Sequence, residues 1–251
     1  MPRQARKKSE SGIYHVMLRG INQQQIFEEP EDFEKFLQIL KDCKAISGYK
    51  LFAYCLMGNH IHLLIKPEEE SLEQAFKRIG GRFVYWYNVK YQRIGHLFQD
   101  RFRSEPVETD VYFMTVLRYI HQNPIKAGLC KVIDAYTYSS YKEYFIESDL
   151  IDTESAYQII SQEQFREFHE EIETKQCLDV DENIRIRLTD EQAKCVMKRV
   201  SGKGSVSEYQ TLREDLKEKY VKKLYEKKLS IRQISRLTGV SKGLVEKWIK
   251  G

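Results

Sequence analysis

Two histidines that could hold a metal ion, His60 and His62, are separated by one aliphatic residue in a segment whose composition predicts a strand. Side chains alternate faces along a strand, so both imidazoles point one way while Ile61, Leu63 and Ile65 point the other. Two ring nitrogens held side by side provide half of a metal site. The alternative is that one histidine is half-buried and hydrogen-bonded and the other is solvated.

A phenol and an amide one helical turn apart form a second chemical pair. Tyr119 and Asn123 share one face of a helix expected from Asp110 to Gln122, and Pro124 places Asn123 at the helix end. A phenol, with a pKa near ~10, is a weak nucleophile that needs a cation to polarise its phosphate target. Two imidazoles and an amide would hold Mg²⁺ or Mn²⁺ with positions open for phosphate oxygens. The alternative is that Tyr119 is packed in the core and Asn123 caps the helix.

The elements that must position these groups alternate in type along the chain. Proline and glycine punctuation and hydrophobic periodicity predict strands and helices over 13–19, 30–48, 49–57, 60–65, 71–91, 102–109 and 110–122, in the order strand, helix, strand, strand, helix, strand, helix. This order matches a split β-α-β sheet with helices on one face. The expected fold is α+β, a ferredoxin-like antiparallel sheet with helices, followed by an all-α C-terminal region.

The charge of the chain is unevenly distributed, although the net charge of the 251 residues is only +4. Residues 71–103 contain seven Lys or Arg against two acids, residues 147–200 contain seven against fourteen, and residues 211–251 contain twelve against five. Two basic blocks separated by an acidic one indicate two surfaces for a polyanion. The alternative is that lysine-rich helix faces merely keep the protein in solution.

Composition excludes several classes of protein. No apolar run approaches the ~18 residues that a membrane span needs, and no hydrophobic segment follows the basic N-terminus as in a signal peptide. The five cysteines are scattered and lack C-x-x-C spacing, which indicates reduced thiols in a cytoplasmic protein.

The C-terminal segment 229–249 resembles a helix-turn-helix with Gly239 in the turn. Ser241 would cap the second helix and, with Lys242 and Lys247, would contact duplex DNA. The expected core consists of Ile231, Ile234, Leu237, Val240, Leu244, Val245 and Trp248. The tail also resembles the duplex-binding domain of the bacterial replication initiator.

Four motifs occur in the order typical of IS200-like tyrosine transposases, and the sequence resembles that family over roughly residues 12–145. The motifs are Tyr14–Val16, Cys55–Leu64, Gly95–Phe102 and Arg118–Leu129. The match is closest to the REP-associated branch of these HUH endonucleases. The resemblance implies that His60, His62 and Asn123 bind Mg²⁺ or Mn²⁺ and that Tyr119 attacks single-stranded DNA.

The expected protein therefore nicks and rejoins single-stranded or hairpin DNA through a 5′-phosphotyrosine, as a monomer or homodimer. Its expected parts are an HUH domain over 1–146, an acidic helical connector over 147–204 and a DNA-binding domain over 205–251. The basic residues expected to contact DNA in the first part are Arg78, Arg82, Lys90, Arg93, Arg101 and Arg103. One rival is a catalytically silent regulator that binds DNA structures on the same fold, and a weaker one is a metal-dependent hydrolase unrelated to DNA.

Overall fold

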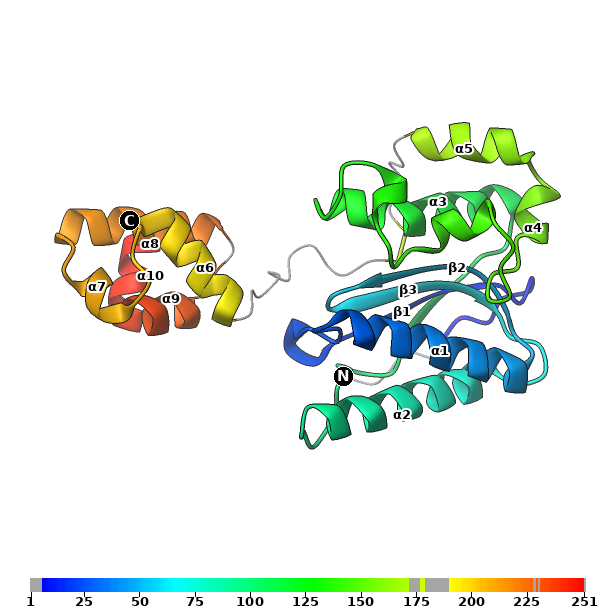
Figure 1. The fold of residues 1–251 in the computed structure, drawn as a ribbon, viewed down its shortest axis with the longest axis horizontal. Helices are drawn as coiled ribbons and strands as arrows, with labels where there is room; N and C mark the ends of the chain where they lie inside the picture. Colours follow the sequence, from blue (N-terminus) through cyan, green and yellow to red (C-terminus); the bar gives the residue numbers. More distant parts are fainter. Residues whose placement is uncertain (1–5, 172–176, 179–189, 228, 230, 251) are drawn as a thin grey trace. The chain divides into compact units, whose positions relative to one another are not determined.

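The computed structural model describes residues 6–171, 177–178, 190–227, 229 and 231–250. The chain divides into two compact units, Met1–Asp179 and Val180–Gly251, and each has its own hydrophobic core. The first unit combines a sheet with helices, whereas the described part of the second is helical (Figure 1). None of the helices in these described ranges is long and apolar enough to cross a membrane.

The first unit is built on a four-stranded antiparallel sheet. The strands lie in the order β2-β3-β1-β4, so the histidine strand is central and β4 is an edge. Their bounds are β1 Tyr14–Arg19, β2 Lys50–Met57, β3 His60–Lys66 and β4 Arg103–Pro106. The expected α+β class with an antiparallel sheet is confirmed.

Helices α1 (Pro30–Ser47) and α2 (Leu72–Lys90) pack side by side on one face of this sheet (Figure 1). The aliphatic side chains of β3 that point toward this layer, Ile61, Leu63 and Ile65, are fully buried. Phe36 of α1 and Phe83 of α2 meet edge to face with ring centroids 5.0 Å apart. This layer is the apolar half of the first core.

The opposite face is covered as well, by α3 (Asp110–Lys126), α4 (Glu154–Tyr157) and α5 (Gln162–Glu170) (Figure 1). The expectation that all helices lie on one face is therefore wrong. The physical reason is that the histidine face also carries apolar side chains, such as Met17 and Cys55, which are buried only if a second layer covers them. The same layer buries His62.

The helix boundaries follow local signals with two exceptions, both in α3. Gly48 ends α1 with a left-handed φ of 64°, and Ser71 caps α2 by accepting from Gln74 N at 3.3 Å. In α3, the cap is Thr109 rather than Asp110. The helix also continues through Pro124, because a proline near the C-terminus removes only one backbone hydrogen bond. Asn123 thus lies inside the last turn and not beyond it.

The acidic stretch 147–204, expected as a connector, contributes to both cores. Ile151, Ala156 and Phe165 are buried in the first core, while α6 (Asp190–Ser201) supplies Met197 to the second. The intervening segments 172–176 and 179–189 lie outside the described residues. Short helices also occur in the connections of the first unit: η1 Ile21–Gln23 follows β1, and η2 Ile133–Ala135 and η3 Ser140–Tyr144 follow α3.

The second unit comprises α6 together with α7 (Val206–Gln210), α8 (Glu214–Glu226), α9 (Ile231–Thr238) and α10 (Lys242–Lys250). Gly239 joins α9 to α10 with a φ of 71°, which favours glycine. The residues expected to form the core of the helix-turn-helix do so: Ile234, Leu237, Val240 and Val245 are buried, and Ile231, Leu244 and Trp248 pack against them.

Candidate active site

The paired histidines lie on one face of β3, as expected from their spacing, with ring centroids 5.1 Å apart. His60 is half-buried, and its Nδ1 donates to Asn59 Oδ1 at 2.7 Å, which fixes its tautomer and directs any ligand role to Nε2. His62 is fully buried. Burial lowers the pKa of His62 well below its ordinary value, so the ring is neutral, which is the form that binds metals.

Helix α3 brings Tyr119 to the same face of the sheet. Its ring centroid lies 5.8 Å from that of His62 and 5.9 Å from that of His15. The helix is anchored at its N-terminal half, where Phe113 meets Phe52 of β2 with ring centroids 5.2 Å apart. The side chain of Tyr119 is 3% exposed and its hydroxyl oxygen is buried. The phenol therefore lies beside the imidazoles and is covered by neighbouring protein atoms.

Two further groups of α3 bear on this phenol. Asn123, one turn after Tyr119, is buried, and its Nδ2 donates to Tyr119 O at 3.1 Å. This hydrogen bond leaves Oδ1 as the oxygen that a metal would use. Lys126 Nζ lies 4.3 Å from the centroid of the Tyr119 ring. This contact places a positive charge against the aromatic ring.

His15 and Glu105, which sequence reasoning did not assign, complete a chain of polar groups behind His62. His15 Nε2 and His62 Nδ1 share a hydrogen bond at 3.0 Å, and both rings are fully buried. On its other side, His15 Nδ1 lies 3.9 Å from Glu105 Oε2. The proximity of the His15 ring lowers the pKa of the Glu105 carboxyl, so this group is a carboxylate. The resulting order is carboxylate, imidazole, imidazole.

The signals that could have found these residues differ. Lys126 follows Tyr119 by seven positions in a helix, which places it two turns further on the same face, so periodicity alone predicts the contact. His15 and Glu105 become neighbours only through pairing in the sheet, where they lie opposite each other on β1 and β4. No pattern of neighbouring residues in the sequence predicts which residues of β1 and β4 lie opposite each other.

A second group of buried histidines lies in the layer formed by α3 and α5. His121 Nδ1 and His169 Nε2 are 3.0 Å apart, and His121 Nε2 is 2.9 Å from Ser140 Oγ. His169 Nδ1 donates to Phe165 O at 2.8 Å. Burial lowers the pKa of His169 to about 3. Because both rings are enclosed by protein partners, this group stabilises the fold rather than forming a site.

The expected DNA-contacting residues of the first unit fall into two groups. Lys90 lies against the carboxylates of Glu29, Glu31 and Asp32 at 2.7 to 3.1 Å, and Arg78 forms an ion pair with Glu70. Their charges are balanced within the protein, which removes the electrostatic reason for assigning them to DNA. Of the other four residues, Arg82, Arg101 and Arg103 are exposed. Arg93 is half-buried, with its Nη2 3.3 Å from Gln24 Oε1.

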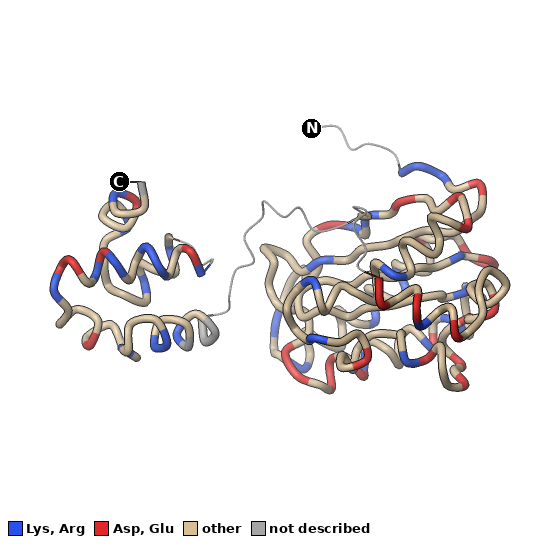
Figure 2. Tube along the Cα trace, turned by 90° about the horizontal axis from the view of Figure 1, so that it is seen from above, with Lys and Arg blue, Asp and Glu red and all other residues tan. Residues whose placement is uncertain are grey.

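In the second unit, Ser241 caps α10, with Leu244 N 3.4 Å from its Oγ. Lys242 and Lys247 are exposed on that helix, and Lys242 lies 3.6 Å from Glu246 across one helical turn. Figure 2 shows the basic residues recurring along the helices of this unit. The expected contact residues are thus accessible at the start of the second helix of the helix-turn-helix.

Among the described residues, no three His, Cys, Asp or Glu side chains gather as a metal-binding cluster. The candidate set is instead two imidazoles with an amide oxygen. Nitrogen and oxygen donors of this kind fit a divalent first-row cation. The carboxylate behind His15 corresponds to the outer partners that commonly orient metal-binding histidines.

The chain is similar to known proteins over part of its length. Residues 8–123 match the sequence model of the family described as "Transposase IS200 like". A curated relative from Haemophilus influenzae, named as a REP-associated tyrosine transposase, is 30% identical over 105 residues. That alignment covers 37% of this chain and 59% of the length of the relative.

A solved structure described as the REP-associated tyrosine transposase bound to a REP hairpin superposes with a TM-score of 0.51 at 15% identity. The superposition covers 61% of this chain and 94% of the other. The four residues expected at the site, His60, His62, Tyr119 and Asn123, all fall within the segment matched by the family. The similarity to the IS200-like transposases therefore extends over the segment that contains the candidate site.

Proposed function

We propose that this protein nicks and rejoins single-stranded DNA at a hairpin, using Tyr119 as the nucleophile beside a divalent cation. The observation that carries the proposal is the convergence of two imidazoles and a phenol from different elements, with His62 and Tyr119 ring centroids 5.8 Å apart. The similarity of residues 8–123 to the IS200-like transposases supports the same chemistry.

In the proposed step, Tyr119 Oη attacks the phosphorus of a phosphodiester. The bond from phosphorus to the 3′-oxygen breaks, the upstream strand leaves as its 3′-oxygen takes up a proton, and the downstream strand stays on the tyrosine through its 5′-phosphate. Attack by a 3′-hydroxyl on this ester reverses the step and rejoins DNA without an external energy source. Lys126, 4.3 Å from the ring centroid, would stabilise the phenolate that starts and ends each cycle.

His60, His62 and Asn123 would hold the divalent cation, which when bound would withdraw negative charge from the scissile phosphate. Because two of the three ligands are imidazoles, the set favours Mn²⁺ over Mg²⁺. With Nε2 of His62 as the ligand atom, its proton is on Nδ1 and is donated to His15 Nε2. His15 then carries its own proton on Nδ1, toward Glu105. In this arrangement His15 and Glu105 are positioning residues for His62.

The substrate proposed for this site is hairpin DNA with an adjoining single strand. The solved relative is described as bound to a REP hairpin, and a folded hairpin presents the single-stranded junction that such a nick requires. The helix-turn-helix of the second unit would bind duplex DNA through Ser241, Lys242 and Lys247, which are exposed on α10.

A covalent adduct tests the nicking proposal. The full chain is incubated with Mn²⁺ and a set of 5′- or 3′-labelled hairpin oligonucleotides with single-stranded extensions, and the products are separated under denaturing conditions. Wild type is expected to form an adduct that survives denaturation and carries only the 3′ label, whereas Tyr119→Phe forms none. Tyr85→Phe, a change of an exposed tyrosine on α2, is the matched control and keeps the adduct.

A second function, a catalytically silent regulator that binds DNA structures, is favoured by one observation. The Tyr119 hydroxyl is buried, so the phenol is not poised for attack before DNA binds. Wild type that binds the hairpins tightly but forms no adduct with Mn²⁺ or Mg²⁺ would refute the nicking proposal in favour of this regulator.

A further inference from the structure

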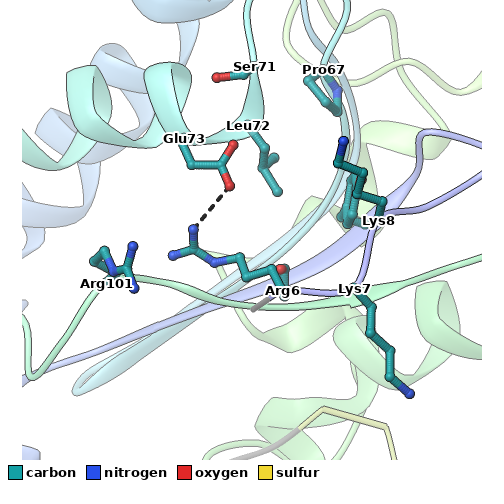
Figure 3. Close-up of a pocket in the computed structure, with 10 residues that line it drawn as sticks. Arg6, Lys7, Lys8, Pro67, Ser71, Leu72, Glu73 and Arg101 are labelled. Carbon is teal, nitrogen blue, oxygen red and sulfur yellow. Dashed lines mark hydrogen bonds and ion pairs between the residues drawn. The ribbon is translucent and has the colours of Figure 1, made fainter. Parts of the chain in front are cut away.

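A basic pocket lies on the side of the sheet opposite the paired histidines. It is lined by Arg6, Lys7, Lys8, Tyr14, Pro67, Ser71, Leu72, Glu73, Arg101 and Ser104, and its volume is about 460 Å³ (Figure 3). Tyr14 lies on β1 and Ser104 on the edge strand β4. Tyr14 is paired with Pro106 and Val16 with Ser104, so all four side chains lie on the same face of the sheet. The pocket is therefore distinct from the candidate active site.

The lining carries four cationic side chains and one carboxylate. Arg6 is the cation that the carboxylate balances, because its Nη1 lies 3.1 Å from Glu73 Oε1 (Figure 3). Arg6 is also held in place by Phe102, whose ring centroid lies 3.8 Å from Cζ and whose backbone oxygen accepts from Nη2. Lys8 and Arg101 are exposed and form no ion pair with any other described residue. The pocket thus has an uncompensated positive charge.

A buried hydroxyl adds a second feature. Ser104 lines the pocket, and its Oγ is buried without a hydrogen-bond partner among the residues that the structure describes. A buried hydroxyl normally has a hydrogen-bond partner, because leaving it without one is unfavourable. An oxygen acceptor in the pocket would satisfy it. The start of α2, by contrast, is already satisfied, because Ser71 and Gln74 cap each other.

The ligand class follows from these features and from the position of the pocket. Uncompensated cations and an unsatisfied hydroxyl suit an anion with several oxygens, of which a phosphodiester is the one consistent with a DNA-processing domain. Arg103, two residues after Arg101, is exposed and lies opposite Met17 on the histidine face of the sheet. Cations therefore continue around the β4 edge from the pocket toward the face that holds Tyr119.

We propose that this pocket binds the phosphate backbone of single-stranded DNA next to the hairpin, with Lys8, Arg101 and Ser104 as contacts. This inference extends the proposed function, because it adds a binding site for the single strand at the far side of the β4 edge from the nucleophile. Lys8, which belongs to the basic N-terminal stretch 6–8 seen in Figure 2, is thereby assigned to substrate binding.

The first test is binding of fluorescein-labelled dT16, which has no hairpin, to the full chain between 50 and 200 mM salt. The double variant Lys8→Ala with Arg101→Ala is expected to bind it roughly tenfold more weakly than wild type. The slope of log affinity against log salt is expected to become shallower by about 1.4, since each lost phosphate contact on a single strand contributes ~0.7. The matched control removes Lys131 and Lys142, two exposed lysines of the same unit without ion pairs among the described residues.

The second test locates the contact. Lysines are acetylated with and without saturating dT16 and quantified by mass spectrometry; Lys8 is expected to be protected and Lys142 is not. Unchanged Lys8 reactivity, or a double variant with the affinity and slope of wild type, would overturn the inference. Adduct formation through Tyr119 is measured separately on the same proteins. An adduct with normal dT16 binding by the double variant refutes only this inference, whereas protection of Lys8 without any adduct refutes only the nicking proposal.

Discussion

Replacing His15 tests whether a residue outside the proposed ligand set controls metal binding. His15 Nε2 lies 3.0 Å from His62 Nδ1, and both rings are fully buried. In His15→Leu, the buried Nδ1–H of His62 loses its acceptor, which costs about 1–3 kcal/mol. His62 Nδ1 must carry a proton when His62 Nε2 binds a metal. The loss of its acceptor therefore destabilises the metal-bound protein and weakens metal binding. Loss of such an outer partner typically lowers metal affinity about 10- to 100-fold, or ~1.4–2.7 kcal/mol.

The assay is titration of the full chain with Mn²⁺, followed by calorimetry and by the electron paramagnetic resonance signal of free Mn²⁺. His15→Gln is the conservative partner, because its amide oxygen can accept the same hydrogen bond, and we expect it to recover most of the affinity. His169→Gln changes another buried histidine of the same unit and should leave Mn²⁺ affinity unchanged. A folded His15→Leu protein that binds Mn²⁺ as tightly as wild type would refute the positioning role, and equal losses in His15→Leu and His15→Gln would do the same.

Three further predictions concern the phenol, the buried histidines and the second unit. Lys126→Gln should slow adduct formation about tenfold in single-turnover experiments at saturating DNA, because it removes the cation 4.3 Å from the Tyr119 ring, and Lys126→Arg should preserve the rate. Burial lowers the pKa of His169 from 6.5 to about 3. Between these two pH values only the unfolded chain takes up a proton at this histidine. The contribution of His169 to the free energy of unfolding is therefore complete above pH 6.5 and is lost as the pH falls. The free energy of unfolding should drop by about 2 kcal/mol between pH 7 and 5 on account of this group, and urea unfolding of His169→Gln should lack that component. Gly239→Ala should destabilise the second unit by about 1–3 kcal/mol, seen as a lower melting transition for that unit alone, because its Cβ would lie 2.7 Å from Val206 Cγ1 at a φ of 71°.

Much of the fold could be predicted because its signals are local. The alternation of side chains along a strand is enough to place His60 and His62 on one face, and Gly48 ends α1 where the periodic apolar pattern stops. Tyr119 and Asn123 share a face because they are four positions apart in a helix. Each of these predictions depends on residues within a single element, where geometry is fixed by the backbone.

The rest depended on contacts between elements. His15 and His62 are 47 positions apart and meet only through the register of β1 against β3. Lys90 was expected to contact DNA, but the carboxylates that balance it come from the start of α1 and its preceding turn. The placement of α3 opposite α1 and α2 likewise follows from how much apolar surface both faces of the sheet carry. The pattern of residue types within one segment does not show how much apolar surface the assembled sheet carries on each face.

The covered hydroxyl of Tyr119 has a consequence for a cell in which replication and repair constantly produce transient single strands. A hydroxyl that water barely reaches is equally out of reach of a strand that collides by chance. If Tyr119 is the nucleophile, as proposed, an encounter alone would leave that strand whole. Under the proposed chemistry, only a substrate that binds strongly enough to displace the neighbouring side chains gains access to the oxygen. Selection would then be completed before any bond is broken, and a wrongly seated strand would depart undamaged.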